Sequence, residues 1–235
     1  MSGEARALAI KQRTETPVSI FNCPSRRLSR AYPTREIVEY YSREGLMPVL
    51  FEKGAKSDYA SNVGSHKDSG PVDFSRMGSW APPKTLAEGQ DPEFVWPIDD
   101  KFQEVHGVRK RNFDGVIYGL SQIRFAQITD GLTNVYLVGE KCVSQAFYTN
   151  GRDRGDNEHM YAGFDNDTNR TAFWPCSRDD EFVEKRTVFG SAHPTTFNMA
   201  FVDGSVRGMS YDIYLAVHRQ LACRDDGAAV SPTGQ

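Results

Sequence analysis

The last third of the chain has the clearest alternation of apolar and polar residues. In the stretch TFNMAFVDGSV, every second residue is large and apolar: Phe197, Met199 and Phe201. A period of two is typical of a strand with one buried face. The Asp203-Gly204 pair that follows favours a two-residue type I′ turn. The pattern therefore predicts a hairpin in which Phe201 faces Val206.

Weaker patterns predict further elements along the chain. Residues 4–13 are good helix formers and predict a short N-terminal helix. Residues 17–25 resemble a brief buried strand closed by proline, and residues 34–46 a short helix that stops at a glycine. The β-branched and aromatic runs at 115–121 and 135–143 predict strands.

Long irregular connections separate these elements. Residues 52–112 are rich in Gly, Pro, Ser, Lys and Asp and predict a loop-rich excursion, while 149–170 form an Asp/Asn-rich loop. A flexible tail is expected at 228–235. The order of one helix followed by strands and loops predicts a single α+β domain over 1–235, with a mostly antiparallel sheet and long loop insertions.

Charge and hydropathy exclude several classes of protein. The 28 basic and 31 acidic residues are interspersed, giving a net charge of -3 without a one-sided basic surface, so nucleic acid is not an expected partner. No run reaches the roughly 18 apolar residues that a bilayer crossing requires. The start of the chain has no export signal, so this chain as it stands is not expected to insert into a membrane.

The cysteines leave two interpretations open. Cys23, Cys142, Cys176 and Cys223 lie far apart and lack Cys-x-x-Cys spacing, which gives no support to a zinc ribbon or a thioredoxin-type site. They could form two disulfides in any of three pairings, or they could be buried free thiols.

His193 and Asp203 look at first like a catalytic pair, but an extended strand keeps them apart. The ten steps between them span about 30 Å, whereas a hydrogen-bonded dyad needs contact within about 3.2 Å. We therefore expect Asp203 to be a turn residue. His193 is either a structural histidine or part of a site that another loop completes.

Oxygen-bearing side chains at alternate positions suggest calcium. Asp165, Asp167 and Asn169 mimic the first ligands of a calcium loop, with Asp156 as a further candidate. Arg170 stands where an EF-hand has glycine, and the closing glutamate is missing, so an EF-hand is excluded. The segment is therefore either a calcium loop of another kind or an Asx-rich turn.

Two tryptophans in the irregular region are candidates for ligand binding. Trp80 and Trp96 each lie beside proline and either form a stacking surface for sugar rings or a partner, or anchor a long loop to the core. The chain has no phosphate-binding loop, serine-hydrolase elbow or zinc-protease motif. An enzyme hypothesis is left with His193 acting beside a loop acid such as Asp156 or Glu158.

Several segments together resemble a known family. FNCPSRR (21–27), SDYASNVGS (57–65), the segment 123–141 ending in GEK, and FGSAH followed by FVDGSV are similar to a bacterial family of prepilin-like proteins of unknown function. GDNE and YAGFDND occur in the same order. The resemblance extends from about residue 15 to 228 and assigns His193, Asp203 and Gly204 to the family's His-x9-Asp-Gly signature.

The resemblance implies a pilin-like domain of the type II secretion pseudopilin class. Such a protein would be a non-enzymatic structural, assembly or surface component of the cell envelope or the exterior, with other pseudopilins or envelope proteins as partners and no cofactor. The family's leader and hydrophobic helix are not recognisable before Cys23, so we expect a truncated copy. The alternative hypothesis is a calcium-dependent module that binds glycan or protein.

Overall fold

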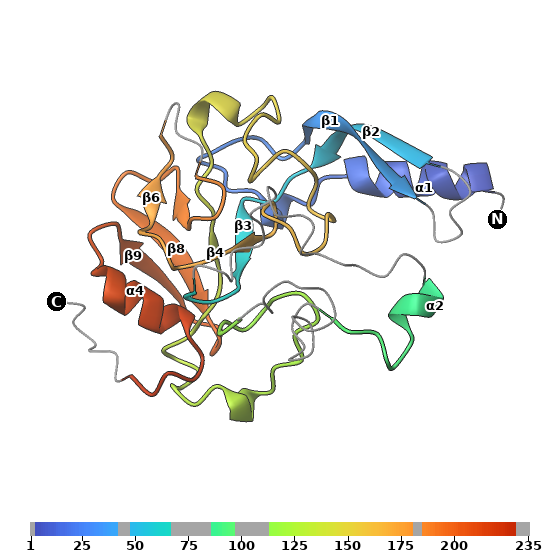
Figure 1. Ribbon diagram of the computed structural model, residues 1–235. Coiled ribbons are helices and arrows are strands. Elements are labelled where there is room, and N and C mark those ends of the chain that lie inside the picture. The colour runs from blue at the N-terminus through green and yellow to red at the C-terminus, as the bar shows by residue number, and fades with distance from the viewer. Residues whose placement is uncertain (1–2, 42–47, 67–85, 97–112, 181–184, 229–235) are drawn as a thin grey trace.

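The computed structural model describes residues 3–41, 48–66, 86–96, 113–180 and 185–228 (Figure 1). In these ranges the chain is an α+β protein with few helices and mostly antiparallel strands, which confirms the predicted class. Trp80, and most of the 52–112 region and of the 228–235 tail, lie outside the described residues.

A five-stranded sheet forms the centre of the molecule, in the order β5-β3-β4-β8-β9. Its strands are β3 (Tyr59–Asn62), β4 (Tyr136–Glu140), β5 (Asn169–Arg170), β8 (Thr196–Phe201) and β9 (Val206–Ser210). β3 and β5 pair in parallel, and the other neighbours are antiparallel. The sheet brings the ends of β3, β4 and β8 close together.

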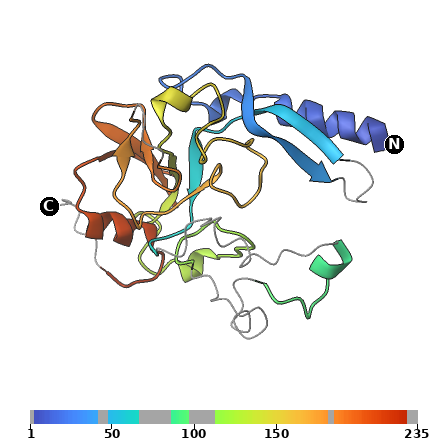
Figure 2. The ribbon, with the colours of Figure 1, turned by 45° about the horizontal axis from the view of Figure 1, so that its top comes forward.

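Within the described residues, two two-stranded ribbons and three α-helices accompany this sheet. β1 (Ala31–Tyr41) and β2 (Pro48–Ala55) form an antiparallel ribbon, while β6 (Ser177–Arg178) and β7 (Gly190–Ser191) pair in parallel. Helix α1 (Gly3–Glu15) lies along β2 on one side of the molecule, and α4 (Leu215–Ala222) packs beside β8 and β9 on the other (Figures 1 and 2). The short α2 (Leu86–Gly89) lies apart from the sheet in both views.

Single turns of 3-10 helix complete the description. They are η1 (Ser19–Phe21), η4 (Phe125–Gln127) and η5 (Gln145–Phe147).

The apolar face of β8 forms the core, as its alternation predicts. Phe197, Met199 and Phe201 are buried against Tyr136 of β4 and against α4. The helix adds a buried histidine to this cluster: His218 Nδ1 lies 3.4 Å from the Tyr136 hydroxyl. Burial lowers the pKa of His218 to about 4, so the ring is neutral inside the core.

The β8–β9 hairpin forms, but not through the predicted two-residue turn. Ala200, rather than Phe201, pairs with Val206. Gly204 has a φ of 84° and donates its N–H to the Phe201 carbonyl at 3.0 Å, whereas Asp203 keeps a negative φ. This is a three-residue loop in which only the glycine is left-handed. The type I′ prediction was wrong because it needed both residues at positive φ.

Three local predictions fail for a common reason. Residues 34–41 belong to β1 instead of a helix, residues 17–25 contain the exposed turn η1 instead of a buried strand, and 115–121 form turns instead of a strand. Within 52–112, the end of β2 and the whole of β3 are regular. Short runs of this kind are compatible with a helix, a strand or a turn, and tertiary contacts decide among these conformations.

Candidate functional site

A cluster of buried charges lies where the loop 21–27 meets β3 and the end of β4. We call it the ion-pair cluster; its members are three cations and three carboxylates: Arg26, Arg27, Lys141, Asp58, Asp156 and Asp179. Each of these side chains is almost fully excluded from water. The charges balance one another, which is what makes burial of so many ions tolerable.

Asp58, immediately before β3, holds the 21–27 loop in place. Its carboxylate lies 3.1 Å from an Arg26 nitrogen and 2.6 Å from an Arg27 nitrogen, and it accepts the Cys23 backbone N–H at 2.8 Å. Arg26 reaches onward to Asp179 at 2.9 Å and to the Lys141 carbonyl at 2.6 Å. One carboxylate therefore fixes the positions of both arginines and of Cys23.

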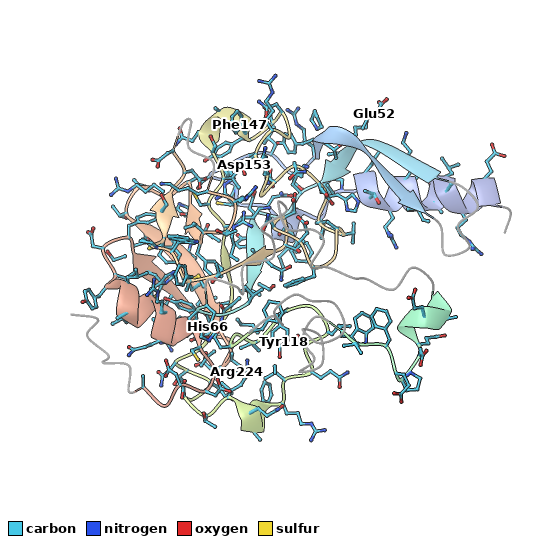
Figure 3. The ribbon with its side chains drawn as sticks, viewed as in Figure 1. Glu52, His66, Tyr118, Phe147, Asp153 and Arg224 are labelled. Carbon is cyan, nitrogen blue, oxygen red and sulfur yellow. The ribbon has the colours of Figure 1, made fainter. Side chains whose placement is uncertain are left out.

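Asp156 anchors the Asp/Asn-rich loop to the same cluster. It pairs with Arg27 and, at 2.9 Å, with Lys141. Burial alone would raise the pKa of Asp156, but the charges of Arg27 and Lys141 hold it well below its usual range. The Lys141 ammonium also donates to the Asp167 carbonyl at 2.7 Å. The loop is thus folded around Lys141. Asp153 of the same loop, labelled in Figure 3, accepts the Ser144 N–H at 2.8 Å.

The remaining residues of the calcium hypothesis hydrogen-bond mainly within their own loop. Asp165 accepts the Asp167 N–H at 3.0 Å, and Asn169 accepts the Asp165 N–H at 3.2 Å. Asp167 accepts the Glu158 N–H at 2.8 Å, and burial raises its pKa to about 7. The structure brings these three together in an Asx-rich turn, with Asp156 directed instead toward Arg27 and Lys141. Calcium binding here stays a prediction.

A second cluster lies at the base of the β8 hairpin and contains His193. We call it the Cys-His-Glu cluster. His193 Nε2 is 3.2 Å from Glu140 Oε1 and 3.7 Å from Cys23 Sγ, and the three ligand-type atoms all lie within 4.8 Å of one another. The Glu140 side chain is 1% exposed and that of His193 is 31% exposed. The cluster is therefore buried on one side and open to solvent on the other.

Hydrogen bonds from neighbouring residues position Glu140 and His193 of the Cys-His-Glu cluster. Glu140 Oε2 accepts the Asn198 N–H at 2.6 Å, which leaves Oε1 for the imidazole. The His193 backbone donates to Ser191 Oγ at 3.1 Å, and the Tyr211 hydroxyl donates to the His193 carbonyl at 3.1 Å. The Glu140 carboxylate and the backbone of His193 are therefore held in place by residues of β7 and β8 and by Tyr211.

The geometry does not match that of an activated cysteine nucleophile. In a nucleophilic triad, the thiol and the acid contact different nitrogens of the histidine. Here both approach Nε2. Burial, together with the nearby Glu140 carboxylate, also raises the pKa of the Cys23 thiol, which disfavours a free thiolate.

Asp203 and Gly204, which the resemblance assigns to the same signature as His193, lie at the tip of the hairpin. Asp203 accepts hydrogen bonds from the Ser205 N–H at 2.9 Å and the Ser205 hydroxyl at 2.7 Å, an Asx-type turn. The structure thus separates the signature into a turn at the tip and a histidine at the base.

An open groove of about 740 Å³ lies away from both clusters and contains Trp96. Its walls include the aromatic residues Tyr118 (labelled in Figure 3), Tyr161 and Phe164, together with Asn169. The Arg13 guanidinium, on α1, stacks 5.3 Å from the centre of the Tyr161 ring. Aromatic faces combined with a few polar groups are typical of a ligand-binding groove.

Sequence reasoning found His193 but missed its partners. From the sequence, Cys23 is either a disulfide partner or a buried free thiol, and no pattern singles out Glu140. The signal was available in the family resemblance, because the matched segments that supply Cys23, Asp58, Glu140 and His193 meet at one place. Separations as large as the 170 positions between Cys23 and His193 hid this arrangement from pattern analysis.

The cysteine alternatives are also settled by the structure. All four cysteines are buried and free, so no disulfide staples the domain. A further group of metal-type side chains in the described residues, Asp130, Cys223 and Asp226, lies partly exposed near the C-terminus. None of the helices in the described ranges has the length and apolar character needed to cross a bilayer.

The chain belongs to the family described as "Protein of unknown function (DUF1559)", whose model matches residues 2–215. No curated protein and no solved structure showed a significant match to the chain.

Proposed function

We propose that this chain is a non-enzymatic structural or assembly domain of pseudopilin type, acting in the cell envelope or outside the cell. Its partners would be other pseudopilins or envelope proteins. Support comes from the family resemblance and from the place where the matched segments meet. The same proposal includes a pilin-like arrangement of the central sheet.

The observation that carries the proposal is the ion-pair cluster. The segments shared with the family contribute Arg26, Arg27, Asp58, Lys141 and Asp156, whose charges are used up against one another inside the protein. Residues that are buried and fully paired cannot act on a substrate. A family that shares them shares a way of folding, which favours a scaffold role over turnover.

Two measurements test this proposal. The full chain is screened pairwise in a bacterial two-hybrid assay against each pseudopilin-like protein of its own cell, and association with at least one is expected. The same chain is assayed on a broad panel of hydrolase substrates, where no turnover is expected. Turnover that disappears in both Cys23→Ser and His193→Ala would contradict the proposal, as would the absence of any pseudopilin partner.

The groove around Trp96 favours a second candidate, a surface module that binds glycan or protein. Stacking of sugar rings on exposed aromatic faces is the physical basis. Binding of oligosaccharides is followed by isothermal titration calorimetry, with and without calcium. Trp96→Ala should abolish it, while Trp174→Ala, which changes a 45% exposed tryptophan that does not line the groove, should not. Equal loss in both variants would count against the groove.

A further inference from the structure

The Cys-His-Glu cluster presents three different metal-ligand atoms to one point. A tetrahedral zinc ion, with bonds of about 2.3 Å to sulfur and about 2.0 to 2.2 Å to nitrogen and oxygen, places its ligand atoms about 3.4 to 3.6 Å apart. The observed separations are 3.7 Å between Cys23 Sγ and His193 Nε2, and 3.2 Å between Nε2 and Glu140 Oε1. These two separations are close to those that such an ion requires, and the third, between Cys23 Sγ and the Glu140 carboxylate, is within 4.8 Å.

The nature of the ligands selects the class of ion. A thiolate and an imidazole favour zinc and similar transition metals over calcium or magnesium, and one carboxylate is a common third ligand of catalytic-type or open zinc sites. The partial exposure of His193 leaves one side of the cluster open to water. Three protein ligands and one open position are thus available.

We propose that Cys23, Glu140 and His193 bind a divalent zinc-class ion through Sγ, one carboxylate oxygen and Nε2, with the fourth position open to solvent. On binding, the Cys23 thiol releases its proton to water and forms the metal–sulfur bond. The thiolate and the Glu140 carboxylate then balance the two positive charges of the ion. This balance matters because the Glu140 side chain is buried and its ion-pair partner among the described residues is His193.

The supporting hydrogen bonds match those expected around a metal site. The second oxygen of Glu140 is occupied by the Asn198 N–H, and the backbone of His193 is held by Ser191 and Tyr211. Such outer contacts orient the ligands before the ion arrives. The ion-pair cluster adds to this, since Asp58 fixes the backbone of Cys23.

Cobalt(II) is the probe, because tetrahedral cobalt bound to a thiolate gives intense visible bands and a sulfur-to-metal charge-transfer band. The full chain is stripped with a chelator, titrated with cobalt and then with zinc. We expect a one-to-one complex with the charge-transfer band, displaced by zinc. Cys23→Ser should abolish the band, and His193→Ala and Glu140→Gln should weaken zinc binding by at least about tenfold.

Cys223→Ser is the matched control, because Cys223 belongs to the other metal-type group with Asp130 and Asp226. It should leave the spectrum unchanged. Loss of the band in Cys223→Ser but not in Cys23→Ser would overturn the proposal, as would the absence of zinc binding to the wild-type chain. Circular dichroism of each variant separates lost binding from lost folding, and His193→Ala, at a partly exposed position, keeps the test valid if Cys23→Ser fails to fold.

Discussion

The two clusters diverge at the end of β4, where Glu140 and Lys141 are consecutive residues. Lys141 enters the ion-pair cluster, and Glu140 enters the Cys-His-Glu cluster. Successive residues of an extended segment point to opposite sides. In the first cluster every charge meets an opposite charge of the protein. In the second, the described residues that contact the buried carboxylate are a histidine and a backbone amide, so a proton or an ion from outside would balance its charge.

The largest expected effect comes from breaking the balance of the ion-pair cluster. Asp156→Ala leaves Arg27 and Lys141 without a carboxylate they both contact and should cost about 3 to 5 kcal/mol of unfolding free energy. Urea unfolding measures it. Asp180→Ala, which removes a partly exposed pair with Lys185, is the control and should cost less than about 1 kcal/mol. Similar costs in the two variants would show that the cluster is not a stabilising unit.

Mild acid should leave the contribution of the ion-pair cluster to stability unchanged and should lower that of the core. The pKa of Asp156 is lowered from 3.8, so its contribution is complete above that pH and is lost only in stronger acid. His218, by contrast, has its pKa lowered from 6.5 to about 4. Between pH 6.5 and pH 4, His218 binds a proton in the unfolded chain but stays neutral in the folded chain. The free energy of unfolding therefore falls as the pH falls, by about 3 kcal/mol over this interval.

Urea unfolding at pH 7 and pH 4.5 separates these two contributions. Between pH 7 and pH 4.5, the pH-dependent loss of stability should be about 2.5 kcal/mol smaller in His218→Leu than in the wild type. The difference between wild type and Asp156→Ala should stay constant over the same range. A difference that shrinks well above pH 4 would mean that Asp156 is not fully paired.

The Cys-His-Glu cluster should respond to an ion where the ion-pair cluster does not. Zinc at about 100 times its dissociation constant should raise the unfolding free energy by about 2.7 kcal/mol in the wild type. It should raise that of His193→Ala by much less, because one of three ligands is gone. Thermal unfolding with and without zinc checks this. An equal zinc effect in both proteins would place the ion elsewhere.

The smallest effect is expected at Asp203-Gly204, the hairpin tip, which belongs to neither cluster. Gly204→Ala should cost about 1 kcal/mol, because φ is 84° and no neighbouring atom lies within 4 Å of an added Cβ. Gly208→Ala in β9 is the control, since its Cβ would meet Thr196 at an ordinary 3.6 Å. Zinc binding should be unchanged in Gly204→Ala. Impaired zinc binding there would mean that the turn positions His193.

The amino-acid sequence alone predicted the elements whose interactions are local. Helix α1 and strand β4 follow from a dozen or fewer neighbouring residues, and so does the burial of alternate side chains in β8. The turn at Asp203-Gly204 was placed correctly, but its type was not, since one left-handed residue was enough. The strand β1 was mistaken for a helix because its partner, β2, decides its conformation.

Tertiary structure decided which charges meet. The sequence shows that cations and carboxylates are present, and even which segments matter, but Arg27 and Asp156 are 129 positions apart and Cys23 and His193 are 170 apart. Periodicity and turn chemistry act over a few residues and carry no information about such pairs. The folded sheet directs Glu140 and Lys141 to opposite sides. It thereby forms the ion-pair cluster, which is buried, and the Cys-His-Glu cluster, which is open to solvent on one side.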